Sequence, residues 1–268
     1  NLVVPGNITG QGTTTLTGDL TVDTSTLVAV ASNNRVGIGT NSPQRQVMIS
    51  RSIADGSGEL GIVSSDSSTS GALGNIHFGN STDSSLASIR ATADGATDAG
   101  KLEFNTEKTG AAIETAMRID SNGRVTKPLH PSFSVRSNAG NNGNTWEQGQ
   151  DIKFQLVDRN NGSHYATGTG RFTAPVAGFY HFNYNGFGYS AGRVPAAGTA
   201  SVQIRKNGTA VIAGAYVEVN TSTGYPNCGF SFSLLLAASD YVTIRAQSQG
   251  QYADASGLYT SFSGFLVG

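Results

Sequence analysis

The stretch NNRVGIGTNSP, residues 33–43, contains closely spaced glycines of the kind that can hold a phosphate. A nucleotide-binding P-loop requires the pattern G-x-x-x-x-G-K-[S/T], and a dinucleotide fingerprint requires a further glycine that opens a helix. Here Gly37 and Gly39 are followed by Thr-Asn-Ser-Pro, with neither a lysine nor a helical pattern behind them. This spacing argues against a phosphate site and favours a turn.

The same stretch has a second copy further along the chain. ASNNRV at residues 31–36 is echoed by DSNGRV at residues 120–125, and a short apolar run precedes each of them. Asparagine and glycine tolerate the positive φ angle that a tight hairpin turn demands. We interpret both copies as turns that separate strands in a structural repeat.

The pentapeptide GYSAG, residues 188–192, matches the G-x-S-x-G motif of a serine nucleophile. That motif requires a strand, a sharp turn and a helix, with the acid and the histidine later in the chain. The sequence after it, RVPAAGTA, does not predict a helix. Every histidine also precedes Ser190, namely His77, His130, His164 and His181. A loop fits this segment better than a catalytic triad.

No other group of residues has the spacing of a catalytic or metal site. The histidines lack ligand spacing, no Asp-rich run has a calcium-loop pattern, and the lone Cys228 excludes a disulfide framework and a thiolate metal cage. Glycan hydrolysis would need paired carboxylates, and no two of the acids pair by sequence: Glu147, Asp151, Asp158, Glu218 and Asp254. We therefore expect no enzyme, no cofactor and no metal.

The composition narrows the partners further. The 268 residues carry a net charge of -1, and only 13% of them are charged. This balanced charge does not indicate binding to nucleic acid or to an anionic membrane. No run of about 18 apolar residues indicates a membrane span. The sequence begins with Asn instead of Met, so we expect a fragment or a processed product.

Recurrent Val/Thr/Ile alternation and the absence of helical periodicity predict an all-β protein. Its aromatic residues are distributed unevenly, because only Phe78 and Phe104 precede Lys127. A half with so few large side chains has little to bury, and burial yields only about 25 cal/mol per Å². We expect the first half to obtain its core from other copies of the chain, in a homotrimer.

Three strings in the first half, GDLTVDTSTL, NNRVGIGTNSP and AMRIDSNGRV, resemble the shaft repeats of bacteriophage tail fibres and related appendages. The resemblance covers residues 18–125 and implies a trimeric shaft in a virion, an extracellular appendage attached to other virion proteins at its N-terminal end. The chaperone segment that often follows such repeats is absent here, so folding would rely on the C-terminal head.

The second half has several short strands with alternating apolar residues, which predict a β-sandwich of jelly-roll type. Phe230, Phe232, Leu234 and Leu236 share one strand face, and Ile152, Phe154 and Leu156 share another. The strings GRFTAPVAGFYHFNY, SVQIRKNGTAV and GLYTSFSGFLV resemble the C1q/TNF-like domain, across residues 131–268 and in the expected order. That resemblance implies a trimer. Proteins of the resembled family bind their partners through surface loops.

These patterns predict three parts. Residues 1–45 form a β-repeat shaft, residues 46–127 a small β-rich shaft or intermediate domain, and residues 128–268 the C1q/TNF-like head. Within residues 46–119 the alternation is looser, in segments such as ELGIVSSD and KLEFN, and a flexible low-complexity linker is the alternative there.

Strand direction indicates where the head binds. In the resembled fold both termini lie at the stalk end, so counting back through antiparallel strands places TAPVAG, KNG and AASD there. The same count places residues 186–198, 220–228 and 247–257 at the far tip. These tip loops combine aromatic anchors with small polar residues, as recognition loops do. The candidate receptor-binding residues are Tyr189, Arg193, Tyr225, Asn227, Tyr252 and Asp254.

We therefore expect a structural phage virion protein, a trimeric tail fibre or receptor-binding appendage that attaches to a glycan or protein on the host cell surface. Neither nucleic acid nor membrane insertion is expected. One alternative is a capsid decoration or head fibre protein with a structural trimer. Others are a glycan depolymerase and a secreted C1q-like lectin.

Overall fold

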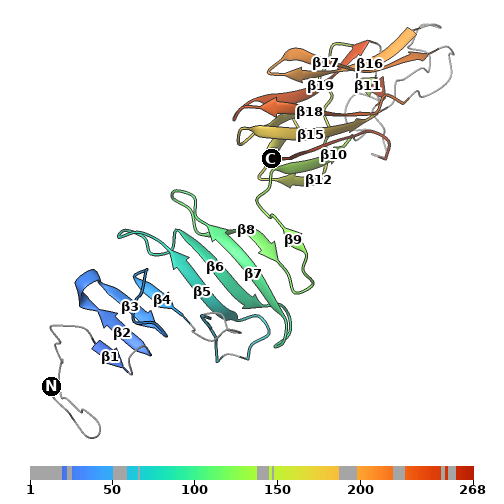
Figure 1. Ribbon diagram of the computed structural model, residues 1–268. Helices are drawn as coiled ribbons and strands as arrows, with labels where there is room; N and C mark the ends of the chain where they lie inside the picture. The colour runs from blue at the N-terminus through green and yellow to red at the C-terminus, as the bar shows by residue number, and fades with distance from the viewer. Residues whose placement is uncertain are drawn as a thin grey trace, which may run out of the picture. The chain divides into compact units, whose positions relative to one another are not determined.

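The computed structural model is an all-β structure, as the alternation predicts (Figure 1). Among the described residues every regular element is a strand except one 3-10 turn, η1 at Ala31–Asn33. The chain divides into two compact units, Asn1–Asp66 and Ser67–Gly268. The structure describes residues 20–22, 26–50, 59–65, 67–137, 145–146, 148–186, 198–219, 227–248, 251–252 and 258–268.

The first unit contains a small four-stranded sheet in the order β1-β2-β3-β4. Its first three strands pair antiparallel, whereas β3 and β4 are parallel. The turn between β2 and β3 contains Asn34 at φ 54°, the left-handed conformation predicted for the repeated turn. The strands are β1 (Leu20–Val22), β2 (Leu27–Val30), β3 (Arg35–Ile38) and β4 (Val47–Ile49).

The two glycines of the NNRVGIG stretch serve strand packing. Gly37 lies within β3, and Gly39 follows it at φ 76°. A side chain at Gly39 would collide with the carbonyl oxygen of Ser50, whose amide donates to Ile38 O at 2.8 Å. Close backbone approach explains this glycine, and the turn interpretation is confirmed for this copy of the motif.

The second copy of the motif is also a turn. Gly123 has φ 78°, and the Asp120 carboxylate accepts hydrogen bonds from the Asn122 and Arg124 amides at 3.0 and 2.9 Å. These amides, together with the Arg124 guanidinium, hold the pKa of Asp120 below its usual range.

The second unit begins with a five-stranded antiparallel meander, β5-β6-β7-β8-β9, drawn as an open sheet in Figure 1. It includes strands expected from KLEFN and AMRI. A strand is also expected at ELGIVSSD, but its described residues 59–65 are assigned to none, and Leu60 and Val63 are exposed. The strands are β5 (Ala72–Phe78), β6 (Ala87–Ala93), β7 (Gly100–Thr106), β8 (Glu114–Ile119) and β9 (Val125–Thr126).

The two faces of this sheet differ in polarity. Ile76, Ile89, Phe104 and Met117 lie opposite one another across β5 to β8, and together they line an apolar face. The alternate positions on the same strands are polar, and Ser88, Thr92, Glu103 and Asn105 among them are buried. The sheet therefore has an apolar face and a polar face, as period-2 alternation requires.

The head is a sandwich of two five-stranded antiparallel sheets, in the orders β12-β10-β21-β15-β18 and β13-β14-β19-β16-β17 (Figure 1). A two-strand ribbon, β11-β20, accompanies them. The strands are β10 (Ser132–Arg136), β11 (Thr145–Trp146), β12 (Leu156–Asn161), β13 (Tyr165–Ala166), β14 (Arg171–Thr173), β15 (Gly178–Asn185), β16 (Gly198–Lys206), β17 (Thr209–Val219), β18 (Phe230–Leu236), β19 (Tyr241–Ser248), β20 (Gln251–Tyr252) and β21 (Ser261–Leu266).

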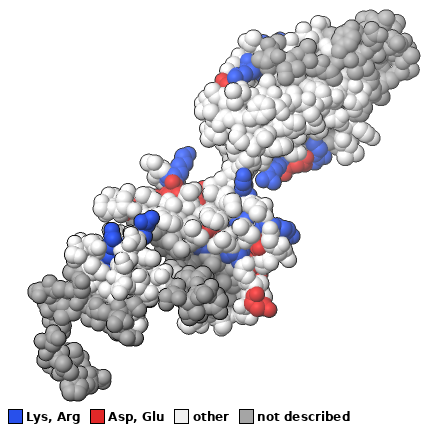
Figure 2. All heavy atoms as spheres, viewed as in Figure 1, with Lys and Arg blue, Asp and Glu red and all other residues white. Residues whose placement is uncertain are grey.

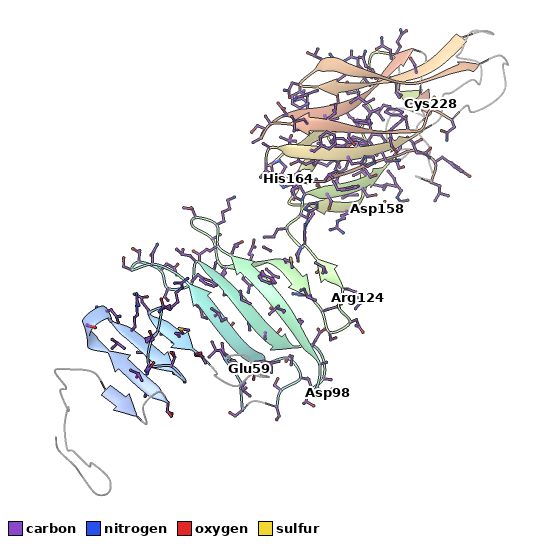
Figure 3. All side chains as sticks on the ribbon, viewed as in Figure 1. Glu59, Asp98, Arg124, Asp158, His164 and Cys228 are labelled. Atoms are coloured by element: carbon purple, nitrogen blue, oxygen red, sulfur yellow. The ribbon has the colours of Figure 1, made fainter. Side chains whose placement is uncertain are left out.

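Aromatic rings fill the space between the two sheets. Phe182 is fully buried and stacks on Phe232, with ring centroids 5.2 Å apart. The predicted apolar face of FSFSLLL is confirmed, because Phe232 and Leu236 are buried while Leu235 points outward at 71% exposure. Cys228 lies inside the head as a small buried side chain (Figure 3).

One predicted strand begins later than its pattern indicated. Ile152 and Phe154 are both buried, as the alternation in DIKFQLVD predicted, but β12 starts only at Leu156. Before that point the chain crosses between sheets, since Ile152 N donates to Ile244 O on β19 whereas Gln155 N donates to Arg136 O on β10. Alternation reports burial, and a sheet-to-sheet crossover buries alternate residues as well.

The three-part division at residues 45 and 127 remains a prediction. The first sheet continues to β4 at Val47–Ile49, and the compact units separate after Asp66.

Candidate functional site

The two termini of the head lie at one end of the sandwich, which we call the base. Ser132 at the start of β10 is paired with Phe265 near the end of β21, and Phe179 N donates to Gly268 O at 2.9 Å. The connections at residues 174–177, 207–208 and 237–240 meet there, where Ala174 N and Asp240 O are 2.8 Å apart. The predicted placement of TAPVAG, KNG and AASD at the stalk end agrees with this register.

Asp240 ties the base loops together. Its carboxylate pairs with Lys206 Nζ at 2.8 Å and accepts from Asn207 Nδ2 at 2.7 Å and from the Ala237 amide at 2.8 Å. These three donors, with Lys206 first, lower the pKa of Asp240 to about 2. The base is therefore built from short, internally bonded connections.

The opposite end of the sandwich, which we call the tip, is where the candidate recognition loops leave the sheets. Asn185 at the end of β15 is paired with Ser261 at the start of β21, and Cys228 N donates to Gly186 O at 2.7 Å. The candidates Tyr189, Arg193, Tyr225 and Asp254 lie outside the described residues. Their role in recognition stays a prediction.

Two of the candidate residues are described, at least in their backbone. Asn227 is exposed, but its Oδ1 accepts from Gly229 N at 2.6 Å and its Nδ2 donates to Asn185 Oδ1 at 3.0 Å. Its amide therefore shapes the turn before β18. Tyr252 is in β20, where it is paired with Thr145 of β11. The next residue of β11, Trp146, is paired with Gln251, so the same ribbon contains both Tyr252 and Trp146.

Sequence reasoning missed a feature on the outward face of the β12-β10-β21-β15-β18 sheet. Phe179 and Leu235 are directly opposed across β15 and β18, and Phe265 follows on β21. They are 46%, 71% and 46% exposed. Buried and exposed apolar residues alternate on the same strands. The positions of the apolar residues in the sequence could therefore have indicated this surface. We call these three residues the outer apolar patch.

The described side chains on the outward face of the other sheet are polar by contrast. Arg171 stacks over the Tyr241 ring at 4.3 Å, and Arg205 and Arg245 both lie within 4.0 Å of an Asp151 carboxylate oxygen. Figure 2 shows broad uncharged areas on the face of the head in view, with charged side chains in small groups near its edges. Among the side chains that the structure describes, the exposed large apolar residues of the sandwich strands thus lie on one sheet.

The groups that could have supported catalysis are dispersed. His181 lies on the β15 face, where Nδ1 is 3.0 Å from Ser233 Oγ and the ring packs on Phe265, as expected of a sheet-face residue. The GYSAG segment falls outside the described residues. Within the described ranges no three His, Cys, Asp or Glu side chains gather as a metal site would require.

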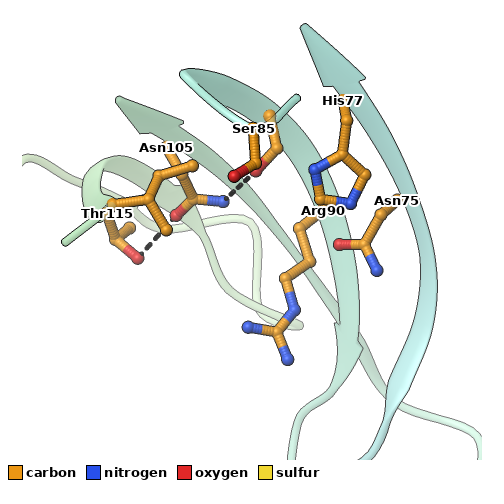
Figure 4. Close-up of a pocket in the computed structure, with 8 residues that line it drawn as sticks. Asn75, His77, Ser85, Arg90, Asn105 and Thr115 are labelled. Carbon is orange, nitrogen blue, oxygen red and sulfur yellow. Dashed lines mark hydrogen bonds between the residues drawn. The ribbon is translucent and has the colours of Figure 1, made fainter. Parts of the chain in front are cut away.

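A polar pocket of about 310 Å³ lies on the polar face of the β5–β9 sheet, and no sequence motif indicated it (Figure 4). Asn105 forms its floor, donating to Ser88 Oγ at 3.1 Å and accepting from Thr115 Oγ1 at 2.8 Å. Its remaining lining residues are Asn75, His77, Ser85, Arg90 and Ile113.

A family model for the C1q domain matches residues 132–267, which is 136 of the 268 residues. The chain belongs to the C1q domain family. C1q domains are often trimeric modules with structural or ligand-binding roles, and they are generally non-enzymatic. The expected C1q/TNF-like head is thereby confirmed. No curated protein matches the chain significantly.

Solved structures similar to the chain include the globular domain of the zebrafish complement 1qA protein, with 17% identity over 52% of this chain and 98% of that chain, at a TM-score of 0.38. The Eiger TNF of S. frugiperda is 11% identical over 52% of this chain and 94% of that chain, at a TM-score of 0.37. Murine APRIL at pH 5.0 is 13% identical over 52% and 99%, at a TM-score of 0.37. The family assignment rests on the C1q match alone.

No helix in the described ranges of the C1q-family chain is long and apolar enough to cross a membrane.

Proposed function

We propose that this C1q-family chain is a structural, non-enzymatic attachment protein of a phage virion. Three copies would associate through the outer apolar patch, and the tip of each head would contact a glycan or protein on the host cell surface. The observation that carries the proposed trimer is the outer apolar patch itself, which is exposed on one sheet of a domain whose family often trimerises.

The patch suits association between copies of the chain. Exposed Phe and Leu side chains that adjoin on one face mark an interaction surface, whereas scattered ones do not. Phe179 and Leu235 adjoin through strand pairing, and the Phe265 ring packs beside His181 on the same face. These residues lie near the base of the head, so association through them would leave the tip loops of each copy available to bind a partner.

The apolar face of the β5–β9 sheet supports the same assembly. Phe78 is 52% exposed on that face and Ile76 is 41% exposed, so much of the apolar surface is left uncovered in one chain. The last strand of this sheet ends at Thr126, and the head begins its first strand at Ser132. A trimer of heads would hold three such sheets close together, at a high effective concentration. We propose that their apolar faces meet.

The phage assignment rests on the shaft-like strings GDLTVDTSTL, NNRVGIGTNSP and AMRIDSNGRV. The turns within these strings have Asn34 and Gly123 at positive φ, which is consistent with repeated tight turns. In this proposal the N-terminal end joins other virion proteins and the head is the outermost part. The chain would then be located in the virion as an extracellular appendage.

The test replaces Tyr189, Tyr225 and Tyr252 together by Ala and measures binding of the fluorescently labelled trimer to a panel of bacterial strains. Binding to a recognised strain should fall at least tenfold, because aromatic anchors dominate recognition by such loops. Tyr241→Ala at the base is the matched control and should bind as the parent does. Equal binding by the triple variant would refute the tip assignment. A stable trimer that binds no strain would favour a capsid decoration role instead.

A further inference from the structure

We propose that the polar pocket of the β5–β9 sheet binds an acidic saccharide, with Arg90 and His77 receiving its carboxylate. This proposal concerns a site separate from the head and does not depend on host attachment by the tip.

The three residues along one side of the pocket have unused hydrogen-bonding capacity. Figure 4 shows Asn75, His77 and Arg90 close together. Asn75 is directly opposite Arg90 in the strand pairing, and His77 is opposite Ser88. Within the described part of the chain the three side chains make no hydrogen bond or ion pair. A guanidinium group free to form a fork of donors is suited to a carboxylate.

The absence of a partner for Arg90 has a structural cause. Its cross-strand neighbour on β7 is Glu103, which would be the natural ion-pair partner. Glu103 is instead engaged from the other side by Arg118, with Arg118 Nε at 2.9 Å and Nη2 at 2.8 Å from Glu103 Oε1. The Glu103 carboxylate is buried and paired, so the lining of the pocket keeps the charge of Arg90 and includes no carboxylate.

The rest of the lining suits a sugar. Ser85, Ser88 and Thr115 supply hydroxyl groups, Asn105 supplies an amide, and Ile113 adds one apolar side chain. Hydroxyl and amide groups match the alternating donors and acceptors of a polyol, and an apolar wall fits the C–H face of a ring. The volume of about 310 Å³ is at the small end of ligand pockets, in the range of a monosaccharide.

The pocket is also preorganised. Asp83 Oδ1 accepts from the Ser85 amide at 2.7 Å, which fixes the loop between β5 and β6. Glu107 N donates to Leu86 O at 3.0 Å, which joins this loop to the one between β7 and β8. Binding would therefore cost little ordering of the protein, which favours affinity in a small site.

The test is calorimetric titration of the whole chain with sodium glucuronate and with N-acetylneuraminate, using glucose as the neutral probe. We expect both acidic sugars to bind, glucose to bind at least tenfold more weakly, and added salt to weaken binding of the acidic sugars. Arg90→Gln should weaken binding roughly tenfold or more, and His77→Gln should weaken it less. Arg124→Gln removes the same charge from the exposed 120–125 turn and should bind as the parent does.

Arg90 and His77 are exposed and unpaired within the described residues, so their variants should unfold at the parent temperature. Loss of binding in a folded Arg90→Gln protein would thus report the site. Equal affinity for glucose, or undiminished binding by Arg90→Gln, would overturn the proposal. Failure of both acidic sugars to bind would also overturn the proposal. None of these three results would bear on attachment by the tip.

Discussion

Tyrosine hydroxyl groups inside the head provide the clearest test at the scale of single residues. The Tyr165 hydroxyl accepts a hydrogen bond from the buried Phe154 amide at 3.1 Å, and the Tyr180 hydroxyl donates to Val176 O at 2.9 Å. Tyr165→Phe leaves a buried amide without a partner and should lower the free energy of unfolding by about 1–3 kcal/mol. Tyr180→Phe leaves only a carbonyl at the partly exposed base and should cost less. Chemical denaturation of both variants would contradict this ranking if Tyr180→Phe were the more damaging.

The same tyrosines predict how the head responds to alkali. Burial raises the pKa of Tyr165, Tyr180 and Tyr184 above the ordinary value. Raised folded-state values mean that their contribution to stability is fully present below the unfolded pKa of about 10 and is lost as pH rises through the folded values. We expect these tyrosines to ionise only as the fold is lost, above about pH 10. Tyrosinate absorbance followed together with circular dichroism checks this.

One titration result would contradict the burial of these tyrosines. If all nine tyrosines titrated together near pH 10 with the circular dichroism unchanged, the three phenols would not be buried as described.

Packing between strands governs the behaviour of individual elements. Gly264 on β21 lies between the Phe133 and Phe182 rings, and an added Cβ would come within 2.9 Å of Phe133 Cε1 and 2.5 Å of Phe182 Cδ1. Gly264→Ala should therefore strain the sandwich and lower the free energy of unfolding by about 1–3 kcal/mol. Gly168→Ala is the control, since a Cβ there meets nothing within 4 Å. Equal unfolding midpoints for the two variants would contradict the register of β21.

Strands could be predicted from the sequence where alternation and burial coincide. The period-2 pattern of FSFSLLL placed Phe232 and Leu236 on the buried face, and the Asn-rich repeat placed a positive φ at Asn34. The pattern of DIKFQLVD could not separate a strand from a crossover, because both bury Ile152 and Phe154. ELGIVSSD also alternates, yet its described residues form no strand, because alternation alone does not provide a neighbouring strand.

The candidate sites could be predicted only in part from the sequence. Counting antiparallel strands located the base loops correctly, because strand direction is fixed once the termini are placed. The polar pocket could not be foreseen, because it depends on which strands are neighbours and on Glu103 being paired with Arg118 and not with Arg90. The outer apolar patch could be predicted in principle, because Phe179, Leu235 and Phe265 alternate with buried residues on their strands.

At the scale of the whole molecule, the described residues of one chain expose two apolar surfaces: the outer apolar patch of the head and the apolar face of the β5–β9 sheet. Association of three copies would cover both at once, and would add buried apolar surface to the aromatic-poor first half. Leu235→Asp places a charge in the head surface without touching the buried core, so it should weaken assembly while the head stays folded.

Solution mass measured by light scattering, over a range of concentrations, tests the trimer most directly. A trimer has a concentration-independent mass near three times the 27.6 kDa chain, and Leu235→Asp should have a lower mass with unchanged circular dichroism. A parent chain that remains a monomer at every concentration would contradict the trimer, because both apolar surfaces would then be exposed in solution.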